Sequence, residues 1–96
     1  MRRSNEQTIG EAIRELIKTF RLETGLNEAK VISSWEKIVG EMIAKHTVKL
    51  WIKRRVLYVE VDSAALRSEL SYAREKIKKS LNREVGENVI DEIVFK

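Results

Sequence analysis

Residues 47 to 62, Thr-Val-Lys-Leu-Trp-Ile-Lys-Arg-Arg-Val-Leu-Tyr-Val-Glu-Val-Asp, alternate apolar and polar side chains on both sides of a basic centre. This alternation is typical of a β-hairpin, because successive side chains of a strand point to opposite faces of the sheet. If the pairing begins next to the turn, three aliphatic pairs share one face: Ile52 with Leu57, Leu50 with Val59 and Val48 with Val61. A slip of one residue would break every pair, so the hydrophobic pattern determines the register.

The opposite face of the hairpin is polar and carries two rings. The same register places Trp51 beside Tyr58 and Lys49 beside Glu60, an aromatic pair and an opposite-charge pair that both stabilise antiparallel strands. The turn is less well specified, because a tight turn would force Arg54-Arg55 into positive φ, which Gly or Asn tolerates better. We therefore expect a wider loop from Lys53 to Val56.

Two helices are predicted before the hairpin. Thr8 and Glu11 form a capping-box pattern, and apolar residues then recur at helical spacing as far as Phe20. Gly25 predicts a stop, and Asn27 can cap a second, largely buried helix that ends near His46. Gly40 inside that helix indicates either close packing or a break.

One further helix and a strand are predicted after the hairpin. Ser63 is a suitable N-cap for a helix with a basic outer surface that runs to about Arg83, and Gly86 ends it. The range 89–95 predicts a last strand, with Ile93 and Phe95 on one face. We expect the later helices to cover the aliphatic face of the sheet, and the first helix to complete that layer or to pack at its edge.

These elements predict an α+β fold with two layers, in the order α-α-β-β-α-β, around a three-stranded sheet. The sequence contains no repeat or linker, so residues 1–96 are expected to form a single domain. Within it, we distinguish an N-terminal helical segment, 1–25, from a core, 26–96.

Composition favours an anionic partner. The chain has 96 residues with a formal net charge of +4, and residues 63–83 hold six basic and two acidic side chains. The absence of cysteine suits a reducing cytoplasm and excludes both a thiol nucleophile and cysteine-ligated zinc. No apolar stretch has the length of a signal or membrane-spanning segment, so we expect a cytoplasmic protein without membrane contact.

The candidate binding residues combine basic groups with aromatic rings. Basic side chains at the hairpin tip would bind phosphates, and the two neighbouring rings would stack on unpaired bases. The alternative is that the first helix covers the rings and the basic tip is only solvated. The predicted nucleic-acid-binding set is Lys49, Trp51, Lys53, Arg54, Arg55, Tyr58, Arg67, Arg74, Lys78, Lys79 and Arg83.

The sequence disfavours an enzyme. His46 is the only histidine, and the sequence marks no partner that would make it a metal ligand or a catalytic base, so we assign it a structural role at a helix end. The four glycines form neither a phosphate-binding loop nor the G-x-x-G clamp of KH modules. We predict no catalytic residue, metal, cofactor or small-molecule substrate.

An ordered set of motifs from residue 26 to 96 resembles the DciA family of bacterial replicative-helicase loaders. The set consists of Trp35-x-x-Ile-Val-Gly-x-x-Ile-Ala-x-His-Thr47, Leu57-x-Val-x-Val-x-Ser63, Glu69-Leu70 and Leu81-Asn-x-x-x-Gly-x-x-x-Ile-x-x-Ile-x-Phe-Lys96. The resemblance implies a fold similar to a type II KH domain, binding to the hexameric replicative helicase, and affinity for single-stranded or forked DNA.

The chain departs from the family pattern at three points. Arg54-Arg55 replaces a Gly that is usual in the hairpin turn, and Leu66 stands where a Trp is common. Many relatives also carry a long extra segment that this sequence lacks, so full loader activity does not follow from the resemblance. We expect a non-enzymatic replication accessory protein that binds the replicative helicase and DNA; the alternative is a general DNA- or RNA-binding module without a helicase partner.

Overall fold

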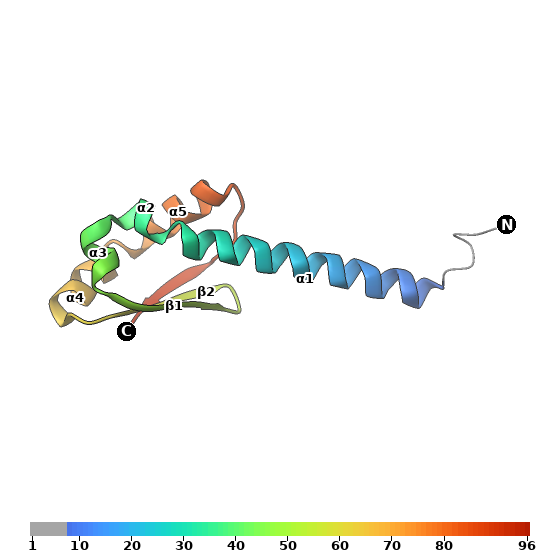
Figure 1. The fold of residues 1–96 in the computed structure, drawn as a ribbon, viewed down its shortest axis with the longest axis horizontal. Helices are drawn as coiled ribbons and strands as arrows, with labels where there is room; N and C mark the ends of the chain where they lie inside the picture. Colours follow the sequence, from blue (N-terminus) through green and yellow to red (C-terminus); the bar gives the residue numbers. More distant parts are fainter. Residues whose placement is uncertain (1–7) are drawn as a thin grey trace.

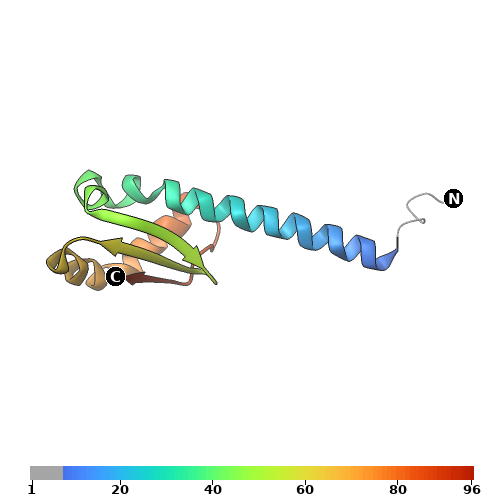
Figure 2. The same cartoon turned by 60° about the horizontal axis from the view of Figure 1, so that its bottom comes forward.

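A three-stranded sheet lies under a layer of helices, and one long helix extends beyond both (Figures 1 and 2). The computed structural model describes residues 8–96. In chain order the elements are α1 (Ile9–Ser33), α2 (Trp35–Val39), α3 (Glu41–Lys45), β1 (Thr47–Lys53), β2 (Val56–Val61), α4 (Ala64–Tyr72), α5 (Arg74–Val85) and β3 (Glu92–Phe95). The predicted α+β fold and three-stranded sheet are confirmed, although two of the predicted helices are divided.

The sheet has the order β1-β2-β3, with β1 antiparallel and β3 parallel to the central strand β2. The predicted hairpin register is confirmed from Lys49–Glu60 to the turn. The predicted pair of Val48 with Val61 is wrong, because an irregularity between residues 47 and 49 places Thr47 opposite Val61. Val48 is consequently 59% exposed instead of facing the core.

The hairpin turn is tight, so the predicted wide loop is wrong. Only Arg54 and Arg55 connect the strands, with φ of 52° and 66°. This is the left-handed conformation that a two-residue hairpin turn requires and that non-glycine residues rarely adopt. Contacts outside the turn hold Arg55 in place, since its carbonyl accepts a hydrogen bond from the Asp91 amide at 2.8 Å. Tertiary contacts therefore override the local preference.

Helix α1 is continuous, and the predicted stop at Gly25 is wrong. Its capping box is confirmed, since the Glu11 amide donates to the Thr8 hydroxyl at 3.1 Å and the Thr8 amide donates to the Glu11 carboxylate at 3.4 Å. Gly25 adopts no left-handed conformation, and Asn27 lies inside the helix and caps nothing. A glycine in a helix interior costs about 1 kcal/mol relative to alanine. The helix continues through Gly25 despite this cost.

Only the C-terminal end of α1 joins the core, so the prediction that the first helix completes the layer or packs at its edge is wrong for most of its length. Val31 is fully buried and is the buried residue of this helix. The N-terminal half projects away from the sheet (Figure 1). There, Ile9 is 80% exposed and Phe20 is 68% exposed. The expected boundary at residue 25 falls inside α1.

The predicted helix from Asn27 to His46 is interrupted twice. Helix α1 ends at Ser33, and a second break follows at Gly40, whose φ of 95° interrupts the helical geometry between α2 and α3. The later predicted helix also divides, at Ala73, although its N-cap is confirmed because the Leu66 amide donates to the Ser63 hydroxyl.

The last strand is shorter than predicted and spans Glu92–Phe95. Val89 and Ile90 belong instead to the loop before it, and both are buried. Asn82 satisfies the backbone of this loop: its side-chain oxygen accepts from the amides of Val89 and Ile90 at 2.9 and 3.1 Å. The hydrophobic segment is thus fixed against the core without a strand partner.

One hydrophobic core lies between the helices and the inner face of the sheet. It draws on every layer and comprises Val31, Trp35, Leu57, Val59, Val61, Leu70, Ile77, Leu81, Val89, Ile90 and Ile93. The central strand β2 alternates buried and half-buried residues along its length. The helical residues of this core therefore pack on one face of the sheet, and the other face is open (Figure 2).

Replacing Trp35 by alanine should lower the free energy of unfolding by about 3 to 5 kcal/mol, as for other large-to-small core changes. The Trp35 side chain is 3% exposed, packs near Phe95 at 6.4 Å between ring centroids, and donates from Nε1 to the Thr47 hydroxyl at 3.0 Å. Urea unfolding measures the change. The control is Tyr72→Ala, since this ring is 91% exposed; equal loss in both variants would contradict the assignment.

Replacing Arg54 by asparagine should raise the free energy of unfolding by about 0.5 to 1 kcal/mol, because asparagine tolerates positive φ better than arginine. Lys53→Asn is the matched control, since Lys53 ends β1 and has no positive φ. Both variants remove one positive charge, so only the turn conformation distinguishes them. A lower unfolding midpoint for Arg54→Asn than for the parent chain would contradict this account.

Candidate nucleic-acid interface

The open face of the sheet carries an aromatic pair. Trp51 of β1 and Tyr58 of β2 are stacked, with ring centroids 5.2 Å apart and an interplanar angle of 10°. Both residues are half-buried. Helix α1 does not cover them, because its buried residue Val31 packs in the core with Val59, whose side chain points to the other face of β2. The alternative in which the first helix covers the rings is therefore wrong.

Two lysines border the stacked rings. The Lys49 ammonium lies 4.9 Å from the centroid of Trp51, and the Lys96 ammonium lies 5.8 Å from the centroid of Tyr58. Cations over aromatic faces at these distances are attracted by the ring electrons. Lys96 was not among the predicted residues. Lys96 follows Val94 by two residues at the end of the last strand, and this spacing could have predicted that both lie on the same face.

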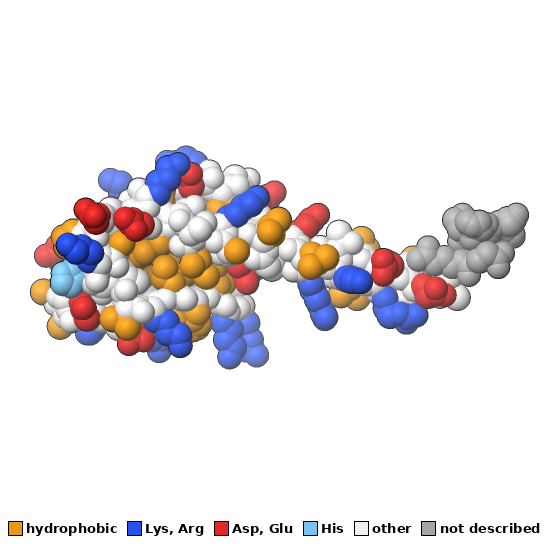
Figure 3. All heavy atoms as spheres, in the orientation of Figure 1, with side chains coloured by type: hydrophobic (Ala, Val, Ile, Leu, Met, Phe, Trp, Pro, Cys, Tyr) orange, Lys and Arg blue, Asp and Glu red, His pale blue; other side chains and the backbone are white. Residues whose placement is uncertain are grey.

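The hairpin tip adds positive charge at one end of the open face. Lys53 ends β1, Arg54 is the first turn residue, and both are exposed. Lysine and arginine side chains project from the tip of the hairpin in the space-filling view (Figure 3). The structure thus brings together Lys49, Lys53, Arg54 and the two rings, as a compact group that a single strand of nucleic acid could follow.

Arg55 differs from Arg54 because its guanidinium is paired with the Asp91 carboxylate. Its Nε and Nη2 donate to the two carboxylate oxygens of Asp91, each at 2.9 Å, and Nη2 also donates to the Asn88 carbonyl at 2.6 Å. The hydrogen bond to Asp91 raises the pKa of the Arg55 guanidinium, and the same bond lowers the pKa of the Asp91 carboxyl. Arg55 therefore ties the hairpin turn to the loop before β3.

The remaining predicted basic residues lie on the helical layer. They are Arg67 on α4 and Arg74, Lys78, Lys79 and Arg83 on α5. These helices cover the inner face through buried residues such as Leu70 and Ile77. The structure therefore places this group on the opposite side of the sheet from the rings.

Lys78 is more enclosed than the other basic residues of α5. Its side chain is 20% exposed, and its ammonium pairs with Glu75 at 2.9 Å and donates to the Asp91 carbonyl at 3.3 Å. The hydrogen bond to Lys78 lowers the pKa of the Glu75 carboxyl. Lys78 therefore holds the start of β3 against α5, whereas the other four basic side chains in this group are exposed.

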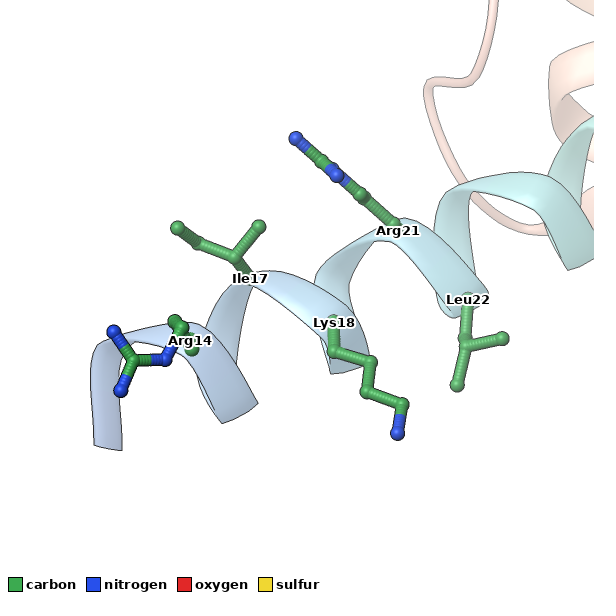
Figure 4. Close-up of a pocket in the computed structure, with 5 residues that line it drawn as sticks. All are labelled: Arg14, Ile17, Lys18, Arg21 and Leu22. Atoms are coloured by element: carbon green, nitrogen blue, oxygen red, sulfur yellow. The ribbon is translucent and has the colours of Figure 1, made fainter. Parts of the chain in front are cut away.

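The described residues offer little that fits catalysis. His46 caps α3 and its Nδ1 lies 2.8 Å from the Asp62 carboxylate, in an exposed pair at a helix end. A hollow on α1 is lined by one helix alone, and its side chains diverge instead of converging on a ligand (Figure 4). Within residues 8–96, no cluster of histidine, cysteine or acidic side chains could hold a metal ion, and no helix has the length and hydrophobicity to cross a membrane.

The fold and this surface define a small α+β domain with an open, basic and aromatic sheet face. A protein-family model described as Dna[CI] antecedent, DciA, matches residues 8–95, which is nearly the whole chain. The chain belongs to the DciA family. The family resemblance predicted from the sequence is therefore confirmed.

Curated relatives agree with this assignment. A UPF0232 protein of Corynebacterium glutamicum is 36% identical over 63 residues, covering 66% of this chain and 35% of that protein. A UPF0232 protein of Streptomyces avermitilis is 32% identical over 84 residues, covering 85% of this chain and 46% of that protein. A Mycolicibacterium smegmatis protein, "UPF0232 protein in recF-gyrB intergenic region", is 26% identical over 84 residues, covering 88% and 43%. The chain spans less than half the length of these relatives.

Replacing Asp91 by asparagine should flatten the pH dependence of stability in acid. Because the Asp91 pKa is lower in the folded protein than its ordinary value of 3.8, the pair stabilises the fold above that pH and loses its effect as pH falls through the lower folded pKa. Urea unfolding at intervals from about pH 6 to about pH 2 measures this, and the gap between parent and Asp91→Asn should shrink with decreasing pH. Glu87→Gln changes an exposed acid outside the pair and serves as the control; a constant gap for Asp91→Asn would contradict the pairing.

Proposed function

We propose that this chain is a non-enzymatic DNA-replication accessory protein of the cytoplasm that binds the replicative helicase and single-stranded or forked DNA. Membership of the DciA family across residues 8–95 carries the helicase part of the proposal. The stacked rings bordered by lysines on an open sheet face carry the DNA part. The chain spans under half the length of its curated relatives, so the proposal concerns binding to helicase and DNA by this domain.

In this proposal, a single strand lies along the open sheet face. Its phosphates contact Lys49, Lys53 and Arg54, and its bases approach the ring pair. Stacking on aromatic side chains tolerates any base, which suits a protein that must act on single strands of any sequence. Arg55 contributes indirectly, because its hydrogen bonds to Asp91 fix the position of the hairpin turn.

The basic group on α4 and α5 is proposed as a second, separate contact. One strand cannot contact both groups without passing around the edge of the domain, because the helices cover the opposite face of the sheet. We therefore assign this group to a second arm of forked DNA, with Arg67, Arg74, Lys79 and Arg83 as phosphate contacts and Lys78 as a residue that mainly supports β3.

The helicase part is tested by direct binding of the purified chain to the replicative helicase of the same organism, after nuclease treatment and at two salt concentrations. Binding that survives both conditions supports the proposal, since phosphate-mediated contacts weaken steeply with salt. Absence of binding, with the domain shown to be folded, would leave the general nucleic-acid-binding module. That module should bind RNA at least as well as DNA, so matched RNA and DNA oligomers distinguish the two.

Replacing Arg54 by alanine should lower affinity for single-stranded DNA and reduce the slope of log affinity against log salt by about 0.7, the value of one lost phosphate contact. Arg55 is left intact, because its loss would release Asp91 and confuse binding with stability. The matched control is Arg21→Ala, on the projecting part of α1, which should leave the slope unchanged. Fluorescence anisotropy measures both, and an unchanged slope for Arg54→Ala would remove the hairpin tip from the interface.

A further inference from the structure

Each ring of the aromatic pair has a lysine beside it. The rings of Trp51 and Tyr58 stack with an offset, since their centroids are 5.2 Å apart, and the Lys49 ammonium lies 4.9 Å from the Trp51 centroid. Lys96 follows β3, which pairs with β2 on the side opposite β1, so its ammonium approaches Tyr58 from the side away from Trp51. Trp51 and the Lys96 ammonium therefore flank Tyr58 on two sides. A base that stacks on the β3 side of Tyr58 must displace the Lys96 ammonium.

The Trp51 and Tyr58 rings are not equivalent as surfaces on which a base could stack. Lys49 lies 4.9 Å from its ring centroid, whereas Lys96 lies 5.8 Å from its own, close to the limit of about 6 Å for such contacts. Beyond Trp51 the sheet ends, because β1 is an edge strand. Beyond Tyr58, the half-buried Val94 of β3 stands directly opposite on the same face. Only the Lys96 end therefore has an aromatic wall, an apolar floor and a weakly held cation.

We propose that this slot, with Tyr58 as its wall and Val94 as its floor, binds one base of a single-stranded nucleic acid by exchange with Lys96. The base stacks on Tyr58, and the displaced ammonium moves to a neighbouring phosphate. There it pairs with a full negative charge instead of with the ring electrons. The inference rests on the proposed nucleic-acid binding and adds Lys96 and Val94 to its residues.

An acidic residue beside the slot limits its affinity for phosphate. Lys96 is hydrogen-bonded through its backbone to Val59 and Val61, at 2.8 and 2.9 Å, and so stands beside Glu60. Glu60 is also the partner of Lys49 in the hairpin register. Glu60 therefore stands between the two lysines in the register of the sheet, and its negative charge repels a phosphate that approaches either of them. Glu60→Gln should increase affinity for DNA.

The test compares two oligomers of equal length, about ten nucleotides, one of thymidine and one of abasic sites, by fluorescence anisotropy on the full chain. The parent should prefer the oligomer with bases. Tyr58→Leu should reduce that preference by about 5- to 150-fold, the range for one lost stacking contact, and should leave affinity for the abasic oligomer nearly unchanged. Tyr72→Leu is the matched control, because Tyr72 is an exposed tyrosine on α4.

Two further variants keep the test decisive if Tyr58→Leu disturbs the fold. Val94→Phe should fill the slot and reduce the preference for bases without changing charge. Lys96→Met should lower the salt slope by about 0.7 with both oligomers, and should retain the preference for bases. Equal binding of both oligomers by the parent chain would overturn the slot but leave phosphate-mediated binding in place. Failure of the folded chain to bind either oligomer would overturn the slot and the DNA part of the proposed function together.

Discussion

The strict alternation of the central strand β2 is the constraint on which the rest of the structure depends. Leu57, Val59 and Val61 point into the core, while Tyr58 and Glu60 point to the open face. Every helix that joins the core must pack on the first set, so the second set is left uncovered by the same alternation. The hydrophobic face that stabilises the domain and the basic aromatic face that we propose for DNA are thus two consequences of one strand.

Arg55 shows how a feature that looks functional in the sequence can be structural. As one of three consecutive basic residues it has the features of a phosphate contact, but its guanidinium forms two hydrogen bonds with Asp91 and one with the Asn88 carbonyl. The contact explains why a left-handed turn tolerates an arginine where glycine would fit more easily. The ion pair is exposed, so its significance lies in the position it fixes and not in a large contribution to stability.

The sequence was sufficient where periodicity and capping determine the outcome. It predicted the pairing of Trp51 with Tyr58, the cap at Ser63 and the sheet of three strands, because each depends on local spacing. It was insufficient where distant contacts decide. The tight turn depends on Asp91, which is far along the chain, and Gly25 continues a helix that its local pattern would end. The predicted binding residues lie on two sides of the sheet for the same reason. Helical spacing shows which basic residues share a side of a helix, but it does not show which face of the sheet that helix covers.

The long helix α1 also has a thermodynamic consequence. Its C-terminal end is held by the buried Val31, whereas side chains such as Ile9 and Leu16 are 80% and 70% exposed. An isolated helix of fewer than about 12 to 15 residues is marginal in water, so the projecting half has little besides its own hydrogen bonds and its capping box to hold it. Amide exchange along α1 should therefore follow a gradient, from rapid local fraying near Thr8 to protection that approaches global unfolding near Val31. One continuous helix thus joins a buried end to an exposed half, and we expect the exposed half to unfold locally before the sheet does.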